Sequence, residues 1–265
     1  MPRFEPHPQR RPAVVTGASS GIGQASALQL AAAGHPVILG ARRLERCEQT
    51  AAEIRDGGGE ALALPLDLTD PSSVEEFAKA AEAGLGPIEV LVSNAGDVLP
   101  QGTVEADPAE FVRQVAVNLL GPQQLVHLLV PGMIERGRGD VVVVTSEVSQ
   151  RPRPFMAAYV ASKTGLEGLV QAMRLEVEGT GVRVGMVRPG PSATEQGSNW
   201  DPEAVDRILE QWTRHGLIRH GGYLRPGDVA AAVVAMVSVP RGTSFAVIEV
   251  QPEAPTRPRD PGSDA

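Results

Sequence analysis

The chain has 265 residues, 42% of them hydrophobic, which is enough for one α/β domain with a full core and short for two domains. Its net charge of -8 provides no basic field to attract phosphates, so nucleic-acid binding is not expected. Apolar runs are all too short for a membrane helix, which needs ~20 residues. The single cysteine, Cys47, excludes a disulfide within the chain and fits the reducing cytosol, so we expect a cytoplasmic protein.

Strand and helix patterns alternate along the chain. A strand over 13–16 precedes a helix over 22–33, and a strand over 36–40 precedes a helix over 44–56. After the turn Gly57-Gly58-Gly59 come a strand over 61–65 and a helix that Asp70-Pro71 opens. A strand over 89–93, a long helical region over 108–135, a strand over 140–146, a helix over 155–178 and a strand over 182–188 follow. A helix over 228–239 and a last strand over 244–250 complete the series.

The strands are continuous apolar runs, which is typical of strands buried on both faces of a parallel sheet. We therefore predict an α/β fold: a single-domain, doubly wound, mainly parallel sheet of about seven strands flanked by helices, Rossmann-like. The domain covers 12–250, between a flexible N-terminal tail over 1–11 and a flexible Pro-rich tail over 251–265. The segment 191–225 breaks the alternation, shows only weak strand signals and is a candidate lid over a substrate.

A glycine-rich turn, Gly17-Ala18-Ser19-Ser20-Gly21-Ile22-Gly23, joins the first strand to the first helix. Gly17 permits a sharp turn, Gly21 lets a ligand approach main-chain N–H groups, and Gly23 lets the helix pack against the strand. The helix N-terminus beyond it suits a pyrophosphate. The alternative is a plain tight turn, but the position between the first strand and the first helix favours a dinucleotide.

The second strand ends in Ala41-Arg42-Arg43. An acidic residue at this place would bind the ribose hydroxyls of NAD(H), and Ala41 stands where it would be. Arginine can pair with a phosphate through two hydrogen bonds. We therefore favour NADP(H) over NAD(H), although Arg42 and Arg43 could instead only begin a helix.

Tyr159 and Lys163 are one helical turn apart, and Ser146 ends the predicted strand over 140–146. These side chains are expected to meet at the carboxyl end of the sheet, where α/β proteins bind ligands. A neighbouring ammonium lowers the pKa of a phenol, and a serine hydroxyl can hold a substrate oxygen. This arrangement predicts acid–base catalysis beside hydride transfer, and the chain uses lysine only at Lys79 and Lys163.

Together these residues resemble the short-chain dehydrogenase/reductase family over about 13–250. The resemblance also rests on Asn94-Ala95-Gly96, Asn118 and Pro189-Gly190 with Thr194. It implies that Tyr159 is the general acid in reduction and the base in oxidation, that Lys163 lowers its pKa and binds ribose, and that Ser146 positions the substrate. Asn118, at a break in the long helix, would hold a water that links Lys163 to solvent. Further implied cofactor contacts come from Ser19, Ser20, Ile22, Asp67 near the adenine, and Leu68.

Three positions depart from the family pattern. Ser93 replaces a frequent asparagine. Glu147 follows Ser146 and can face a basic or hydroxylated substrate, turn to solvent, or pair with Arg151 or Arg153. The last strand lacks the usual glycine-rich ending, which removes one basis for a tetramer, so either a homodimer or a homotetramer is expected.

The sequence thus predicts an NADP(H)-dependent oxidoreductase that acts on a small-molecule carbonyl or secondary alcohol and has no metal site. The alternatives are an NAD-dependent dehydrogenase of the same fold and a non-catalytic NADP(H)-binding sensor or scaffold. Candidate walls of an apolar substrate pocket are Leu99, Val148, Met156, Pro191 and Trp200.

Overall fold

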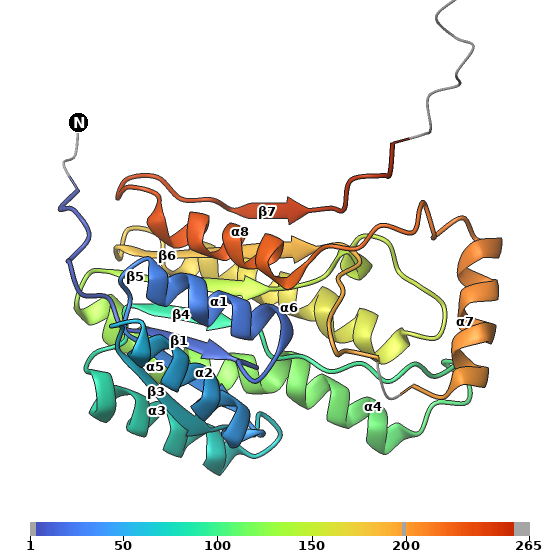
Figure 1. Ribbon diagram of the computed structural model, residues 1–265, viewed down its shortest axis with the longest axis horizontal. Coiled ribbons are helices and arrows are strands. Elements are labelled where there is room, and N and C mark those ends of the chain that lie inside the picture. The colour runs from blue at the N-terminus through green and yellow to red at the C-terminus, as the bar shows by residue number, and fades with distance from the viewer. Residues whose placement is uncertain (1–3, 198–199, 257–265) are drawn as a thin grey trace, which may run out of the picture.

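A computed structural model describes residues 4–197 and 200–256 of the chain as a three-layer α/β structure (Figure 1). The sheet has seven strands, all parallel, in the order β3-β2-β1-β4-β5-β6-β7. Their bounds are β1 Ala13–Thr16, β2 Val37–Ala41, β3 Ala61–Pro65, β4 Val90–Ser93, β5 Gly139–Val144, β6 Val182–Pro189 and β7 Val247–Val250. The predicted fold class is confirmed. The strand order reverses between β1 and β4, and ligands bind at such a point in open parallel sheets.

Helices cover both faces of the sheet (Figure 1). On one face lie α1 (Gly21–Ala32), α2 (Leu44–Asp56) and α8 (Pro226–Ser238), and on the other lie α3 (Pro71–Leu85), α5 (Gly121–Glu135) and α6 (Ala157–Glu176). Successive residues of β1 face opposite layers: Val14 belongs to the core that contains Phe77 of α3, and Val15 belongs to the core that contains Leu30 of α1. This two-residue period explains why the strands are apolar without alternation.

The long helical region contains a change of helix type. It begins as α4 (Pro108–Val115), continues as a π-helical turn, η1 (Ala116–Leu120), and then becomes α5. Asn118 lies at the centre of η1 and is fully buried. The sequence predicted a break in the helix at this residue, and the π-helical turn is where the helix departs from regular geometry.

Two differences from the sequence prediction bear on the site. The strand predicted over 140–146 ends at Val144, and Ser146 instead begins the short helix η2 (Glu147–Ser149), where its hydroxyl accepts from the N–H of Val148 at 3.4 Å. The segment 191–225 contains a helix, α7 (Pro202–Arg214), which packs beyond the carboxyl ends of the strands (Figure 1). Its burial of Ile208 and Trp212, one turn apart, explains why this segment is helical.

The described part of the expected N-terminal tail contacts the amino ends of the strands. Arg11 is 6% exposed and pairs with the buried Asp140 of β5, while Arg10 donates to the carbonyl oxygen of Leu85 at 2.7 Å. Residues 4–11 therefore include anchored side chains. None of the helices within 4–197 and 200–256 is long and apolar enough to cross a membrane.

Candidate active site

A cavity of about 740 Å³ opens at the carboxyl ends of the strands. Its volume is in the range of sites that bind small molecules and cofactors. All the predicted site residues line it except Gly23 and Asn118, and the lining set is Gly17, Ser19, Ser20, Gly21, Ile22, Arg42, Arg43, Asp67, Leu68, Asn94, Ala95, Gly96, Ser146, Tyr159, Lys163, Pro189, Gly190 and Thr194. Residues more than 170 positions apart in the sequence therefore form one site.

Two glycines of the glycine-rich turn have no room for a side chain. A Cβ on Gly23 would lie 2.3 Å from the carbonyl oxygen of Gly17, and one on Gly17 would lie 2.8 Å from Cα of Ala95. Gly17 also has a φ of 67°, which favours glycine. Gly23 thus acts through packing against the turn. The Nδ2 of Asn94 donates to the carbonyl oxygen of Thr16 at 2.9 Å and holds β4 against β1.

The arginines after β2 have different surroundings. Arg42 is exposed and lines the cavity. Arg43 donates from Nη2 to the hydroxyls of Ser20 at 2.8 Å and Ser19 at 3.1 Å. Asp67 accepts at Oδ1 from Thr69 N at 2.9 Å, and this bond and others hold the pKa of the Asp67 carboxyl below its ordinary value. These groups present cations and hydroxyl donors at one end of the cavity.

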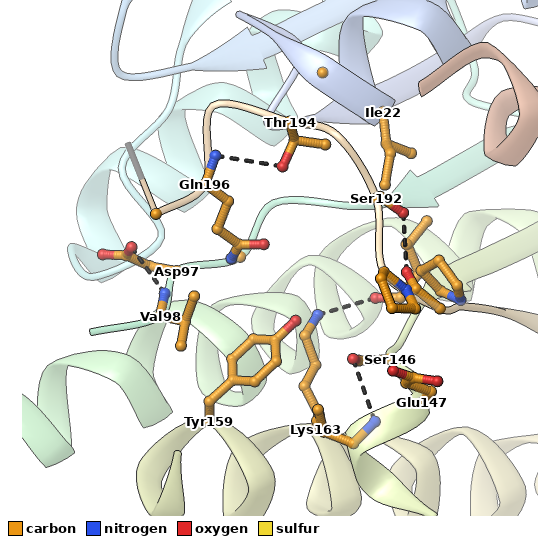
Figure 2. A pocket seen from close by; sticks show the side chains of 18 of the residues that line it. Ile22, Asp97, Val98, Ser146, Glu147, Tyr159, Lys163, Ser192, Thr194 and Gln196 are labelled. Carbon is orange, nitrogen blue, oxygen red and sulfur yellow. Dashed lines mark hydrogen bonds between the residues drawn. The ribbon is translucent and has the colours of Figure 1, made fainter. Parts of the chain in front are cut away.

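Tyr159 and Lys163 extend from α6 toward the segment that carries Thr194 (Figure 2). The Nζ atom of Lys163 lies 5.8 Å from the centre of the Tyr159 ring. Burial raises the pKa of Tyr159 above its ordinary value, and a hydrogen bond with Ser146 opposes that rise. This direction is opposite to the lowering that the resemblance implies, because desolvation disfavours the phenolate more than the hydrogen bond with Ser146 stabilises it. Tyr159 is therefore a protonated phenol at neutral pH.

Lys163 is 3% exposed, and its Nζ donates to the carbonyl oxygen of Val144 at 3.0 Å. Burial lowers the pKa of Lys163 to about 8, while the charge of Glu167 opposes the shift. At pH 7 most of the population is still an ammonium. Two further hydrogen-bond donors of that ammonium remain for groups in the cavity.

Asn118 lies behind the cavity wall. Its Oδ1 accepts from the N–H of Asp97 at 2.8 Å, and its Nδ2 donates to the carbonyl oxygen of Asp97 at 2.8 Å and to the Ser162 hydroxyl at 3.0 Å. A Cβ on Gly96 would lie 3.2 Å from Asn118 Oδ1 and 3.4 Å from Lys163 Nζ. The amide thus fixes the loop after β4 beside Lys163.

The Glu147 carboxylate pairs with Arg153, one of the two arginines expected as partners, and accepts from Nε2 of Gln251 at 3.3 Å. Glu147 also lines the cavity and is 7% exposed. Its charge is compensated within the protein. A basic substrate is therefore not needed to neutralise it.

The substrate end of the cavity has an apolar wall. Of the five expected wall residues, Val148, Met156, Pro191 and Trp200 line the cavity, whereas Leu99 does not appear among its lining residues. Trp200 donates to the carbonyl oxygen of Val98 at 3.2 Å, and Trp212 donates to that of Pro154 at 3.0 Å. Both indole N–H groups therefore have partners.

Three contributions were missed from the sequence. Trp212 reaches the cavity from α7, Gln251 and Pro252 reach it from the segment expected to be a tail, and Glu195 reaches Arg43 from the segment 191–225. Within the parts of the chain that the structure describes, no cluster of three or more His, Cys, Asp or Glu side chains could hold a metal ion.

The arrangement fits a nicotinamide dinucleotide. The glycine-rich turn and the start of α1 can hold a pyrophosphate. Arg42 and Arg43 line the same cavity as the phenol of Tyr159 and the ammonium of Lys163.

Residues 11–204 match the sequence model of the short chain dehydrogenase family. Glycine betaine reductase ATRR of Emericella nidulans is 37% identical over 91% of this chain, and the match spans 18% of that protein's length. Ketoacyl reductase HetN of Nostoc sp. is 33% identical over 84% of this chain and 74% of its own length.

An alcohol dehydrogenase from Thermococcus sibiricus, solved with 5-hydroxy-NADP, is 31% identical and superposes with a TM-score of 0.80 over 95% of this chain and all of its own. Because the family match covers well over half of the chain, the protein belongs to the short-chain dehydrogenase family of NAD(P)-dependent oxidoreductases.

Proposed function

We propose that the protein transfers a hydride between NADP(H) and a carbonyl or secondary alcohol, with Tyr159 as the general acid in reduction and the general base in oxidation. The observation that carries the proposal is the meeting of Ser146, Tyr159 and Lys163 in the cavity that the glycine-rich turn also lines. A pure binding protein has no need of this set, which argues against a sensor or scaffold.

In reduction, Ser146 would donate a hydrogen bond to the substrate oxygen and hold it beside the phenol. Tyr159, kept protonated by its burial, would deliver a proton to that oxygen. When bound, the nicotinamide supplies or accepts the hydride, and its oxidised form adds a positive charge that favours the phenolate in the reverse direction. Lys163 would bind the ribose hydroxyls with the donors that Val144 leaves free.

Asn118 would contribute by holding the loop after β4 in place and by lying beside the path from Lys163 to solvent. The remaining predicted cofactor contacts, from Ile22 and Leu68 to Pro189, Gly190 and Thr194, belong to the same proposal.

NADP(H) is favoured over NAD(H) because Ala41 provides no carboxylate to repel a 2′-phosphate, and Arg42 and Arg43 stand next to it. The 5-hydroxy-NADP in the Thermococcus sibiricus alcohol dehydrogenase supports this preference. An NAD-dependent enzyme is the alternative. It would bind NADH tightly and NADPH not at all.

The substrate is proposed to be a small or medium apolar molecule, since Trp200, Trp212, Met156 and Val148 offer apolar surfaces. The names of the relatives, glycine betaine reductase and ketoacyl reductase, are consistent with a reductive reaction. A homodimer or homotetramer in the cytoplasm is also proposed, and Val112 and Leu120, 63% and 56% exposed on α4 and η1, support association through these helices.

The test is NADPH consumption against a panel of ketones, aldehydes and quinones, with NADH in parallel and Tyr159→Phe as the matched variant. Reduction by the parent protein, with a loss of about 100-fold or more in kcat/KM for the variant, would support the proposal. If NADPH binds but neither carbonyl reduction nor oxidation of the matching alcohols occurs, the sensor reading would replace it.

A further inference from the structure

The segment that follows β6 crosses the mouth of the cavity and reaches the cofactor-binding turn. Thr194 lies against Gly21, since a Cβ on Gly21 would be 3.3 Å from Thr194 Cγ2. The next residue, Glu195, contacts the start of α2: its Oε2 lies 2.8 Å from Nη1 of Arg43, and its Oε1 lies 2.6 Å from Nη1 of Arg46. One carboxylate thus ties the two sides of the cleft together.

Arg43 has two kinds of partner. It donates to the hydroxyls of Ser19 and Ser20 on the glycine-rich turn, and it pairs with Glu195 on the opposite side. A 2′-phosphate at the end of β2 would need the same guanidinium. A phosphate monoester carries up to two negative charges and a carboxylate carries one, so the phosphate is the stronger competitor for Arg43.

Arg46 lies three residues beyond Arg43 on α2, on the same helical face. Its Nη1 contacts both carboxylate oxygens of Glu195, at 2.6 and 2.8 Å. If Arg43 turns to a phosphate, Glu195 therefore keeps a partner. The segment would stay closed while Arg43 changes its ligand.

We propose that Glu195 is a latch that slows cofactor release by tying the segment after β6 to α2. When a 2′-phosphate binds Arg43, the ion pair between Arg43 and Glu195 is lost, and the ion pair between Arg46 and Glu195 keeps the latch closed. Glu195 is then also a determinant of cofactor preference, because it competes with the 2′-phosphate of NADPH for Arg43, and NADH has no 2′-phosphate. The inference rests on the proposed NADP(H)-dependent function and extends it to the control of release.

The experiment measures dissociation rates and affinities of NADPH and NADH for the parent protein, Glu195→Gln, Arg46→Gln and the double variant. Dissociation is followed by the loss of nicotinamide fluorescence after mixing with excess oxidised cofactor. Glu210→Gln is the control, because it removes the same charge from the exposed face of α7 in the same segment.

Glu195→Gln is expected to speed NADH release about three- to tenfold, the scale of one or two half-exposed ion pairs, and to shift the affinity ratio toward NADPH. Arg46→Gln is expected to shift the ratio away from NADPH, because a phosphate on Arg43 would then leave Glu195 without a partner. A general structural defect would move both cofactors together and would not give opposite shifts.

The double variant separates the latch from direct attraction of the phosphate by Arg46. If the latch operates, the effect of Arg46→Gln largely disappears when Glu195 is already neutral. The proposal is overturned if Glu195→Gln behaves like Glu210→Gln, or if the Arg46→Gln effect persists in full in the double variant. Titration of the parent protein tests the proposed NADP(H) preference separately, and the NADH dissociation rates test the latch even if that preference fails.

Discussion

Glu167 and Arg188 form a two-point ion pair beneath the candidate active site: Arg188 Nε donates to Oε1 at 2.9 Å and Nη2 donates to Oε2 at 2.8 Å. Glu167 is 3% exposed and lies one helical turn beyond Lys163 on α6. The Ser149 hydroxyl donates to the same carboxylate at 2.5 Å. The pair therefore joins α6 and β6 to the short helix that Ser146 begins.

Replacing Glu167 by glutamine should destabilise the fold, because it removes the buried two-point partner of Arg188 and leaves only the more exposed Glu249, 3.3 Å from Arg188 Nη1, as a counter-charge. The expected loss is about 2–3 kcal/mol in the free energy of unfolding. Urea denaturation at pH 7 measures it. Glu75→Gln is the control, since its pair with Lys79 on α3 is exposed and should change stability by less than about 1 kcal/mol. Equal effects of the two variants would contradict a structural role for the buried pair.

The same pair should contribute to acid sensitivity. Burial acts to raise the pKa of Glu167, but hydrogen bonds from Arg188 and Ser149 outweigh it and hold the pKa below the ordinary value of 4.5. The stabilisation is therefore present above pH 4.5 and is lost as the pH falls through the lowered pKa. Between pH 5 and 3, the parent protein should lose more stability than Glu167→Gln, as measured by urea denaturation at each pH. Parallel curves for the two proteins would disprove this.

Lys163→Met should abolish carbonyl reduction and at the same time stabilise the protein. The shift of the Lys163 pKa from 10.5 to about 8 shows that the folded protein disfavours the ammonium. The variant removes the cost of burying the ammonium but also loses the hydrogen bond to Val144. The net effect is expected to raise the free energy of unfolding by about 1–2 kcal/mol at pH 7. The gain should shrink as the pH rises from 8 toward 10.5, because the lysine of the parent protein then becomes neutral when folded.

Urea denaturation at pH 7 and pH 9.5, with activity assays alongside, checks this. Lys79→Met on α3 is the matched control, since Lys79 is exposed and should change stability by less than about 1 kcal/mol. A Lys163→Met variant that is less stable than the parent protein at pH 7 would refute the reasoning.

Arg42→Ala should weaken NADPH binding about tenfold or more and leave NADH binding within about twofold, because only NADPH carries the 2′-phosphate that this guanidinium is proposed to bind. Arg42 is exposed at the cavity, so its removal should not disturb packing. Fluorescence titration with both cofactors measures the change. Arg214→Ala, at the end of α7, removes the same charge elsewhere, and an equal loss of NADPH binding there would mean that net charge alone matters.

Cys47 should be unreactive in the folded protein. It is fully buried in α2, and burial raises the pKa of its thiol to about 11, so the reactive thiolate is rare at pH 8. An aromatic disulfide reagent should label one thiol per chain only after unfolding in guanidinium chloride. Rapid labelling without denaturant would show that α2 opens readily.

Repeating local patterns made most of the fold predictable. The apolar strands and the glycine-rich turn follow from short segments, and the spacing of Tyr159 and Lys163 puts both on one helical face. Even α7 carries a readable signal. Asp201-Pro202 begins it as Asp70-Pro71 begins α3 and Asp107-Pro108 begins α4, each with the Asp side chain accepting from a backbone N–H. The aromatic residues of this segment follow no helical period, so the helix start at Asp201-Pro202 was not predicted.

Contacts between distant segments could not be predicted in this way. Glu195 lies 152 positions from Arg43 and Gln251 lies 104 from Glu147, and no local pattern marks either residue as part of the site. The raised pKa of Tyr159 is a similar case, because it depends on how completely α6 is covered and not on the spacing of its residues.

The two ends of the domain differ in what can be attached to them. Gln251 and Pro252 form part of the cavity wall, whereas Arg10 and Arg11 lie at the amino ends of the strands, on the opposite edge of the sheet. A fusion partner or affinity tag joined directly after β7 would stand beside the cavity that the proposed substrate would enter. Immobilisation on a solid support should therefore be made through the N-terminal side, which leaves that entrance facing the solution.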